Sequence, residues 1–335
     1  MHLMVDRAPL NQYAFCVHRI PVGVFGASGY AGRELCALLN AHPQLRLVYA
    51  TANAQRGETA VLGGQEVTFV ATEDAPVNQA ELVFSALPHG ASAAWVAVAR
   101  GEGLRAIDLS SDLRPGHTTE DVPYGLTEVA RERLRGAPLI ANPGCYPTAI
   151  LLSLVPLLAR GLVRAGSTIV LDAASGVTGA GNSPKPELMF AEVSENYRAY
   201  AVGNEHRHLP EMRSLVGSYG TDADLLFTPH LLPVARGILA TVTVQLSQEI
   251  DNPLQLWHEH FAGERFIEIS EKLPTLRDVV HRNAVRISVR KAHGLRAPTL
   301  IVLSAIDNLV KGAAGQAVQN ANVCLGLPEA MGLPL

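Results

Sequence analysis

The stretch Ile20-Pro21-Val22-Gly23-Val24-Phe25-Gly26-Ala27-Ser28-Gly29-Tyr30-Ala31-Gly32 decides the fold of the first half of this chain. Its first six residues form an apolar run that predicts a buried strand, and residues 30–40 carry leucines at helical spacing. A strand, a glycine-rich turn and a helix in this order favour dinucleotide binding. Glycine lets the backbone approach a pyrophosphate, and the helix N-terminus favours its charge.

The glycine spacing is Gly-x-x-Gly-x-x-Gly, which is a weaker signal than Gly-x-Gly-x-x-Gly. An ordinary strand–helix turn is therefore the alternative. We expect the residues of the turn to contact the cofactor; they are Gly26, Ala27, Ser28, Gly29, Tyr30 and Gly32.

The residues after the second predicted strand favour NADP over NAD. An NAD site usually carries a carboxylate there, which holds the ribose 2′-hydroxyl. The stretch from Ala50 to Arg56 contains none, and Arg56 could meet a 2′-phosphate with Thr51 and Asn53 beside it. A solvated surface charge is the alternative for Arg56.

Strands and helices alternate through the first half of the chain. Apolar runs at 45–50, 82–86, 104–109 and 139–141 predict strands, and 91–100 predicts a helix. This order predicts an α/β fold whose parallel sheet has both faces covered. After about residue 165, a period-two pattern along most of 237–246 and alternation at 284–290 predict an antiparallel sheet with one solvent face, and 299–306 is predicted as a further strand. A last helix is predicted over about 308–325.

The stretch Asn142-Pro143-Gly144-Cys145-Tyr146-Pro147-Thr148 places a cysteine between a tight turn and a helix. Pro147 suits the first position of that helix, which the apolar run 149–158 continues. A sulfur at this end faces unpaired backbone N–H groups and the positive end of the helix dipole, and both favour the thiolate. We therefore predict that Cys145 is a nucleophile; a buried structural thiol is the alternative.

The stretch His206-Arg207-His208-Leu209-Pro210-Glu211 is the densest group of ionisable residues in the chain. Pro210 suits a helix start, so the histidines are predicted to lie in the turn before a helix. A histidine there can exchange protons near neutral pH. Two alternatives stay open. One is a metal site formed by His206, His208 and Glu211, for which no further ligands are evident, and the other is a structural pair of surface histidines.

The composition limits the class of protein. The chain has 335 residues, enough for two domains, of which 48% are hydrophobic and 17% charged, with a formal net charge of −4. The chain has no basic cluster that would indicate a nucleic-acid partner, and no apolar run approaches the roughly 18–20 residues that span a bilayer. The cysteines lie far apart and the first 19 residues lack a secretory signal. We therefore expect a reduced, cytoplasmic protein without a metal site.

Together these motifs resemble those of the N-acetyl-gamma-glutamyl-phosphate reductase family, type 1, over about residues 20–325. The glycine turn, the Cys145 turn and the His-Arg-His-Leu-Pro-Glu motif carry the resemblance, and further stretches match at 87–90, 108–114, 124–126, 175–181, 195–200, 227–231 and 307–314. The resemblance implies a Rossmann-type dinucleotide-binding domain plus an inserted α+β domain with a mainly antiparallel sheet. The glyceraldehyde-3-phosphate and aspartate-semialdehyde dehydrogenases have this architecture.

The resemblance also implies the domain order. Residues 20–148 and 308–335 would form a discontinuous NADP-binding domain, because the last helix returns to the first domain. Residues 149–307 would form the domain for catalysis, substrate binding and oligomerisation. Residues 1–19 remain as an N-terminal extension whose role is open. A homo-oligomer, either a dimer or a tetramer, is expected.

The implied activity is the NADPH-dependent reduction of N-acetyl-gamma-glutamyl phosphate to N-acetyl-L-glutamate 5-semialdehyde and phosphate, in arginine biosynthesis. Cys145 would attack the acyl phosphate and form a thioester, which NADPH then reduces. His208 is the expected acid/base and His206 a helper on the substrate side. Glu211 is expected to orient one of these two rings.

The remaining expected site residues bind substrate or cofactor. Arg114 and Arg207 are candidates for the carboxylate or the phosphate, since a guanidinium can hold either group through two hydrogen bonds, and a structural ion pair is the alternative for both. Asn308 resembles the asparagine that binds the nicotinamide amide in related dehydrogenases, with a plain helix N-cap as the alternative. The further expected residues are Asn142, Ser175 and Gly176 for the substrate, and Pro88, Gly90 and Gly179 for the cofactor.

Two alternatives to this function remain. One is an acyl-phosphate reductase for another acid, such as aspartyl phosphate or an aminoadipyl phosphate carried by a protein, because motifs do not fix the length of side chain that a pocket accepts. The other is a nucleotide-sensing binding protein that has lost catalysis. Such a protein would need neither Cys145 nor the His-Arg-His motif, and both are present.

Overall fold

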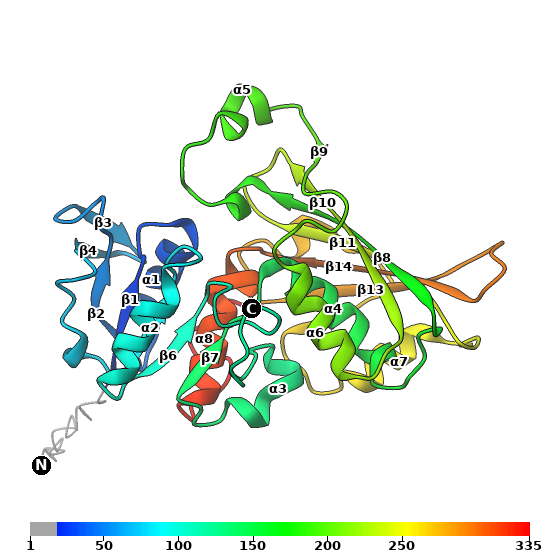
Figure 1. Ribbon diagram of the computed structural model, residues 1–335, viewed down its shortest axis with the longest axis horizontal. Coiled ribbons are helices and arrows are strands. Elements are labelled where there is room, and N and C mark those ends of the chain that lie inside the picture. Colours follow the sequence, from blue (N-terminus) through cyan, green and yellow to red (C-terminus); the bar gives the residue numbers. More distant parts are fainter. Residues whose placement is uncertain (1–18) are drawn as a thin grey trace, which may run out of the picture.

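The computed structural model describes residues 19–335, whose strands form two seven-stranded sheets (Figure 1). The first sheet has the order β3-β4-β2-β1-β5-β6-β7, and its neighbouring strands are parallel except for the hairpin of β3 and β4. Its strands are β1 (Ile20–Phe25), β2 (Leu45–Thr51), β3 (Thr59–Leu62), β4 (Gln65–Val70), β5 (Leu82–Ser85), β6 (Arg105–Asp108) and β7 (Leu139–Ala141). The predicted extension lies outside the described residues, apart from its last residue.

Helices cover both faces of the first sheet, as predicted. On one face, α1 (Tyr30–Ala41) and α8 (Gly315–Cys324) share a core with β1, in which Leu35 of α1 and Val318 of α8 are fully buried. On the other face, Ala99 of α2 (Ser92–Gly101) lies in a core with Phe25 and Val83. A further helix, α3 (Thr127–Leu134), packs on α8. The end of the chain therefore returns to the first sheet, while the boundaries at 148 and 308 stay a prediction.

The second sheet has the order β12-β13-β14-β11-β8-β10-β9 and is mainly antiparallel. Only the pairs β8/β10 and β12/β13 are parallel. Its strands are β8 (Ser167–Gly176), β9 (Arg198–Ala199), β10 (Ala223–Leu232), β11 (Ile238–Gln245), β12 (Ile267–Ile269), β13 (Val285–Ala292) and β14 (Thr299–Ile306). The alternation that predicted this sheet is confirmed in β11, where every second residue from Ile238 to Val244 is fully buried. The long parallel pair of β8 and β10 was not predicted.

The helix α4 (Cys145–Leu158) packs against β11 and β14 of the second sheet, and every residue after Cys145 in it is buried. Pro147 is its third residue, not its first, but it still lies in the first turn, where a missing N–H costs nothing. The last predicted helix divides into the π-helix η5 (Val310–Ala314) and α8. The other helices of this half are α5 (Phe190–Val193), α6 (Leu209–Ser218) and α7 (Pro253–His260).

Short 3₁₀ helices complete the described chain, namely η1 (Val77–Gln79), η2 (Val177–Ala180), η3 (Pro186–Leu188) and η4 (Leu276–Asp278). Figure 1 shows α5 on a segment that extends away from the second sheet. Among the helices within residues 19–335, none has the length and apolar character needed to cross a bilayer.

Candidate active site

The glycine turn before α1 is shaped for the close approach of a ligand. Gly26 has a φ of +74°, and a Cβ on it would lie 2.7 Å from the carbonyl carbon of Ala86. A Cβ on Gly32 would lie 2.3 Å from the Gly26 carbonyl oxygen. Gly29, the N-cap residue of α1, provides no side-chain cap, so the first N–H groups of the helix are left for an anion. The turn therefore fits the pyrophosphate of a dinucleotide.

Thr51 supports this turn from inside the protein. Its hydroxyl accepts a hydrogen bond from the Gly26 N–H at 3.2 Å, and its carbonyl accepts the Ala27 N–H at 2.7 Å. Thr51 is fully buried, so its side chain supports the turn from behind, and its expected contact with the cofactor stays a prediction. Tyr30 and Ser28 lie at the outer side of the turn, where Tyr30 is exposed and Ser28 half-buried.

The predicted 2′-phosphate pocket lies just after β2. Asn53 is held there, because its Oδ1 accepts hydrogen bonds from the backbone N–H and the hydroxyl of Thr72 at 2.8 and 2.9 Å. Arg56 is exposed, and one of its nitrogens donates to the Asn53 carbonyl at 3.3 Å. Within the described residues Arg56 forms no ion pair, so its guanidinium can meet an anion.

Three turns meet at one edge of the first sheet, because β1, β5 and β7 are parallel and end there. The glycine turn follows β1, and the turn with Pro88 and Gly90 follows β5. Gly90 is exposed, and its N–H donates to the Asp112 carboxylate at 2.8 Å, which fixes this second turn. The third turn, after β7, carries Cys145. The cofactor turn and the candidate nucleophile therefore lie at the same edge.

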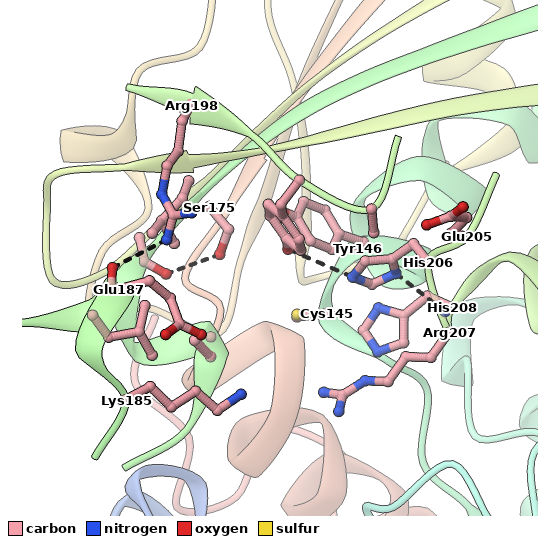
Figure 2. Close-up of a pocket in the computed structure, with 17 residues that line it drawn as sticks. Cys145, Tyr146, Ser175, Lys185, Glu187, Arg198, Glu205, His206, Arg207 and His208 are labelled. Carbon is pink, nitrogen blue, oxygen red and sulfur yellow. Dashed lines mark hydrogen bonds between the residues drawn. The ribbon is translucent and has the colours of Figure 1, made fainter. Parts of the chain in front are cut away.

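Cys145 is the first residue of α4 and lies in a cavity of about 360 Å³ (Figure 2). Gly144 is the N-cap residue and gives no side-chain cap to the helix. Glycine is required there, because a Cβ on Gly144 would lie 2.7 Å from Nε2 of His208. The cavity brings together the predicted residues Cys145, Ser175, Gly176, Gly179, His206, Arg207 and His208.

The two histidine rings lie side by side in this cavity, with centroids 4.8 Å apart. His206 is held by neighbours, because its Nδ1 accepts the His208 N–H at 3.1 Å and its Nε2 lies 3.5 Å from the Tyr200 hydroxyl. His208 is buried and precedes α6, and its Nδ1 has no hydrogen-bond partner within the described residues. His208 therefore has ring nitrogens left to exchange a proton.

Burial keeps both histidine rings neutral. It lowers the pKa of His206 to about 4, with a further contribution from the Arg207 charge. Burial also holds the pKa of His208 well below 6.5, followed by the effects of Arg114 and His206. A neutral imidazole is a base, so either ring can accept a proton at neutral pH.

Burial also raises the pKa of the Cys145 thiol above its usual value. Arg207, Arg114 and the Tyr146 N–H act in the opposite direction, but they do not offset the burial. This burial opposes the helix end and the nearby arginines, which favour a resting thiolate, and so favours the thiol in the free enzyme. Its reactivity depends on a base that removes the proton, and the neutral imidazoles beside it can act as that base.

Glu211 supports the Cys145 turn and does not orient a histidine. Its fully buried carboxylate accepts hydrogen bonds from Arg114 Nη1 at 3.1 Å, the Tyr124 hydroxyl at 3.0 Å and the Gly144 N–H at 3.2 Å. In the part of the chain that the structure describes, it forms no hydrogen bond with either histidine ring. The expected role of Glu211 is therefore corrected to that of a residue that positions the turn.

Arg114 is likewise an interior residue and does not line the cavity. Besides its bond to Glu211, its Nε donates to the Asn142 carbonyl at 2.8 Å and its Nη2 to the Leu109 carbonyl at 2.7 Å. Each guanidinium nitrogen thus has a partner, which favours the structural ion pair, and the expected contact of Arg114 with substrate stays a prediction. Arg207, by contrast, lines the cavity and forms no ion pair within residues 19–335.

Asn142 and Asn308 are also buried supports. The Asn142 side chain is fully buried and its Oδ1 accepts a hydrogen bond from Asn320 at 2.8 Å. The Asn308 Oδ1 accepts the Gly237 N–H at 2.8 Å, and its Nδ2 donates to the Thr178 hydroxyl at 2.9 Å. The hydrogen bonds give both side chains a supporting role, and their expected contacts with substrate and nicotinamide stay predictions.

The end of the chain reaches Cys145 through η5. Asp307 holds the turn that leads into this helix, because its Oδ1 accepts the N–H groups of Leu309 and Val310 at 2.7 and 3.1 Å. A Cβ on Gly312 would lie 2.7 Å from the Cβ of Cys145. Glycine at this position lets η5 pack directly against the nucleophile and cover one side of it, which leaves Cys145 half-buried.

Ser175 and Gly176 end β8 beside the cavity. The Ser175 hydroxyl donates to the Gly176 carbonyl at 3.1 Å, and a Cβ on Gly179 of η2 would lie 2.8 Å from that hydroxyl oxygen. These two residues therefore form part of the cavity wall, and their expected contact with substrate stays a prediction.

The metal alternative for His206, His208 and Glu211 finds no support in the geometry. Within the described residues, the three-carboxylate group Glu128, Glu264 and Glu329 is the one cluster spaced to hold an ion. Its charges are met by Arg131, which pairs with Glu264 and Glu329, and by Lys311, which pairs with Glu128.

Several residues that line the cavity were missed in the sequence, among them Tyr146, Lys185, Glu187, Arg198, Tyr200 and Glu205. Tyr146 follows Cys145 directly, and the Tyr200 hydroxyl donates to the Tyr146 hydroxyl at 3.2 Å. Arg198 and Tyr200 are two residues apart, a spacing that places side chains on one face of a strand. That spacing is the one sequence pattern that could have indicated that Arg198 and Tyr200 line the same cavity.

Two family profiles match the chain. Residues 21–137 match the profile described as semialdehyde dehydrogenase, NAD binding domain, and residues 145–308 match that described as semialdehyde dehydrogenase, dimerisation domain. The second match begins at the candidate nucleophile.

Several similar proteins carry the same name, N-acetyl-gamma-glutamyl-phosphate reductase. The N-acetyl-gamma-glutamyl-phosphate reductase of Symbiobacterium thermophilum is 40% identical, over 94% of this chain and 97% of that protein. The one of Desulforudis audaxviator is 41% identical, over 94% and 98%. Among solved structures, a probable aspartate-semialdehyde dehydrogenase from Pseudomonas aeruginosa has a TM-score of 0.75 at 23% identity, over 91% of this chain and 98% of that chain. This likeness confirms the expected fold class.

Proposed function

The chain belongs to the N-acetyl-gamma-glutamyl-phosphate reductase family, and we propose that it reduces N-acetyl-gamma-glutamyl phosphate to N-acetyl-L-glutamate 5-semialdehyde and phosphate with NADPH. One observation carries the chemistry. Cys145 opens a helix in a cavity that also holds two neutral histidines and the unpaired guanidinium of Arg207.

The first step uses the Cys145 sulfur. His208 takes the thiol proton, and the sulfur forms a bond to the acyl carbon while the bond from that carbon to the phosphate oxygen breaks. The phosphate leaves with the electron pair, and Cys145 carries a thioester. Arg207 is positioned to hold the phosphate, since a guanidinium binds phosphate oxygens strongly.

The second step reduces the thioester. When bound, NADPH supplies the hydride. The hydride adds to the thioester carbon, and His208 gives the proton taken from the thiol to the carbonyl oxygen, so a hemithioacetal forms on Cys145. When the carbon–sulfur bond breaks, His208 takes that proton back from the oxygen and passes it to the sulfur, which releases the aldehyde and restores the Cys145 thiol. The N–H groups at the start of α4 face the reacting centre and favour negative charge there.

NADP is the proposed cofactor. The semialdehyde dehydrogenase NAD binding profile supports a nicotinamide dinucleotide, and the glycine turn fits its pyrophosphate. The absence of a carboxylate from Thr51 to Arg56, and the unpaired Arg56 itself, favour the 2′-phosphate form. Residues 20–148 and 308–335 would form the domain that binds it.

A homo-oligomer in the cytoplasm is proposed as well. The second half of the chain matches a profile named for dimerisation, which supports self-association through residues 149–307. Whether two or four copies assemble is a question for light scattering or sedimentation of the purified protein.

The deciding experiment runs the reaction backwards. Purified protein should reduce NADP only when both N-acetylglutamate semialdehyde and phosphate are present, and arsenate should replace phosphate. Aspartate semialdehyde and an aminoadipate semialdehyde should be used far less efficiently. A higher kcat/KM with either of these would favour the related acyl-phosphate reductases, and no reduction with any aldehyde would favour a nucleotide-binding protein without catalysis.

A further inference from the structure

We propose that Arg198 binds the α-carboxylate of the substrate and so selects the amino-acid end of the acyl phosphate. This inference rests on the function proposed above and assigns the group that recognises the part of the substrate remote from the reaction.

The backbone of Arg198 is fixed at the edge of the second sheet. Arg198 lies in β9, which pairs with β10 so that Arg198 is opposite Leu231. Tyr200, two residues later, reaches the cavity and donates to the Tyr146 hydroxyl. Because residues two apart share a face of an extended chain, Arg198 and Tyr200 point to the same side, and both line the cavity of Cys145.

The guanidinium of Arg198 is available to a ligand. Its Nη2 donates to the Glu187 backbone carbonyl at 3.1 Å, which orients the side chain. In the described part of the chain it forms no ion pair, although the Glu187 carboxylate lines the same cavity. The half-buried guanidinium keeps donors in the planar arrangement that matches a carboxylate.

The positions of two arginines match the two charged ends of the substrate. Figure 2 shows Arg198 and Arg207 on opposite sides of Cys145. Figure 2 shows the Arg207 guanidinium and the Lys185 ammonium on the same side of Cys145, and two cations there favour the phosphate, the most highly charged group of the substrate. The carboxylate, at the other end of a short carbon chain, then extends toward Arg198.

Other charged groups line the cavity and must be separated from Arg198 by experiment. In Figure 2 the Lys185 ammonium and the Arg207 guanidinium both point into the space below Cys145, so Lys185 belongs with the phosphate end. Glu187 and Glu205 are carboxylates, which do not attract an anionic substrate.

The test removes first the charge of Arg198, by mutation, and then the α-carboxylate of the substrate, by use of an analogue that lacks it. The enzyme is assayed with N-acetylglutamate semialdehyde and with 4-acetamidobutanal, which is the same molecule without the α-carboxylate. Arg198→Met should lower kcat/KM for the semialdehyde by about 10- to 100-fold, the effect of one charge-assisted contact, and should leave kcat/KM for 4-acetamidobutanal within about twofold. Arg198→Lys should recover part of the loss.

Matched variants make the outcome specific. Lys291→Met removes an exposed charge on β13 and should leave kcat/KM unchanged for both aldehydes. Lys185→Met should instead raise the KM for phosphate. The KM values for phosphate and NADP should stay unchanged in Arg198→Met, which also shows that the variant is folded. An equal loss with both aldehydes, or a rise confined to the phosphate KM, would overturn the assignment of Arg198. An inactive wild-type enzyme would overturn the proposed function itself.

Discussion

The guanidinium of Arg114 and the carboxylate of Glu211 form an ion pair of 3.1 Å behind the turn that carries Cys145. Both side chains are almost fully buried. The same carboxylate accepts the Gly144 N–H, so the pair connects α6 to the N-terminus of α4. The geometry of the nucleophile therefore depends on a buried charge pair.

We expect Arg114→Met to lower the free energy of unfolding by about 3–5 kcal/mol, because it leaves the Glu211 charge buried without a partner. Urea denaturation measures this change. The double variant Arg114→Met with Glu211→Gln should recover part of the stability, since both charges are then absent. Unchanged stability together with a raised KM for phosphate would instead show that Arg114 binds the substrate.

Cys145→Ser should lower turnover by at least about three orders of magnitude, because a covalent mechanism loses its nucleophile and a serine alkoxide is scarce at neutral pH. The dissociation constant of NADPH, measured by fluorescence titration, should change little. Ordinary activity in the serine variant would remove Cys145 from the mechanism.

Alkylation of the free enzyme should reveal the raised pKa of Cys145. Because burial holds the thiol protonated, its rate of reaction with iodoacetamide should still be rising at pH 9. Mass spectrometry should find Cys145 labelled before Cys36 and Cys324, which are buried, with the pKa of Cys36 raised to about 12. A rate that levels off below pH 8 would restore the resting thiolate that the sequence predicted.

The sequence predicted those features whose causes are local. The strand, turn and helix at residues 20–41 follow from apolar spacing and from glycines that the turn itself requires, and β11 follows from its alternation. The sequence also placed Cys145 at a helix start, because proline, glycine and the apolar run are adjacent to it.

The rest depends on contacts between distant segments. Arg114 and Glu211 are 97 residues apart, so nothing local shows that each neutralises the other. The raised pKa of Cys145 arises from burial, to which the approach of Gly312 from the end of the chain contributes. The sequence predicted the helix that begins at Cys145, and with it the effect of the helix dipole on the thiol. It did not predict this burial.

Arg56→Ala should narrow the preference of the enzyme for NADPH over NADH. A charge-assisted contact with the 2′-phosphate contributes about 1.5–3 kcal/mol, so the affinity for NADPH should fall by about 10- to 100-fold while that for NADH stays the same. Arg46→Ala, near the start of β2, is a control that removes an exposed arginine at the opposite end of the strand from the β2 turn. If both cofactors weaken equally, Arg56 acts on the fold, and if neither weakens, another residue contacts the phosphate.

His208→Asn should lower kcat by about 10²–10⁴, because asparagine keeps a polar group of similar size but cannot exchange a proton near neutral pH. His206→Asn should be milder and should act mainly on the substrate KM. Because the pKa of each ring is lowered, both rings stay in the basic form as the pH falls. The kcat/KM of the wild-type enzyme should therefore not decrease between pH 7 and 6 through protonation of a histidine. The acid limb, which lies at lower pH, should disappear in the His208 variant alone. If His206→Asn damages kcat more, the two histidines exchange roles, and loss of activity on chelation would replace proton transfer with metal chemistry at this pair.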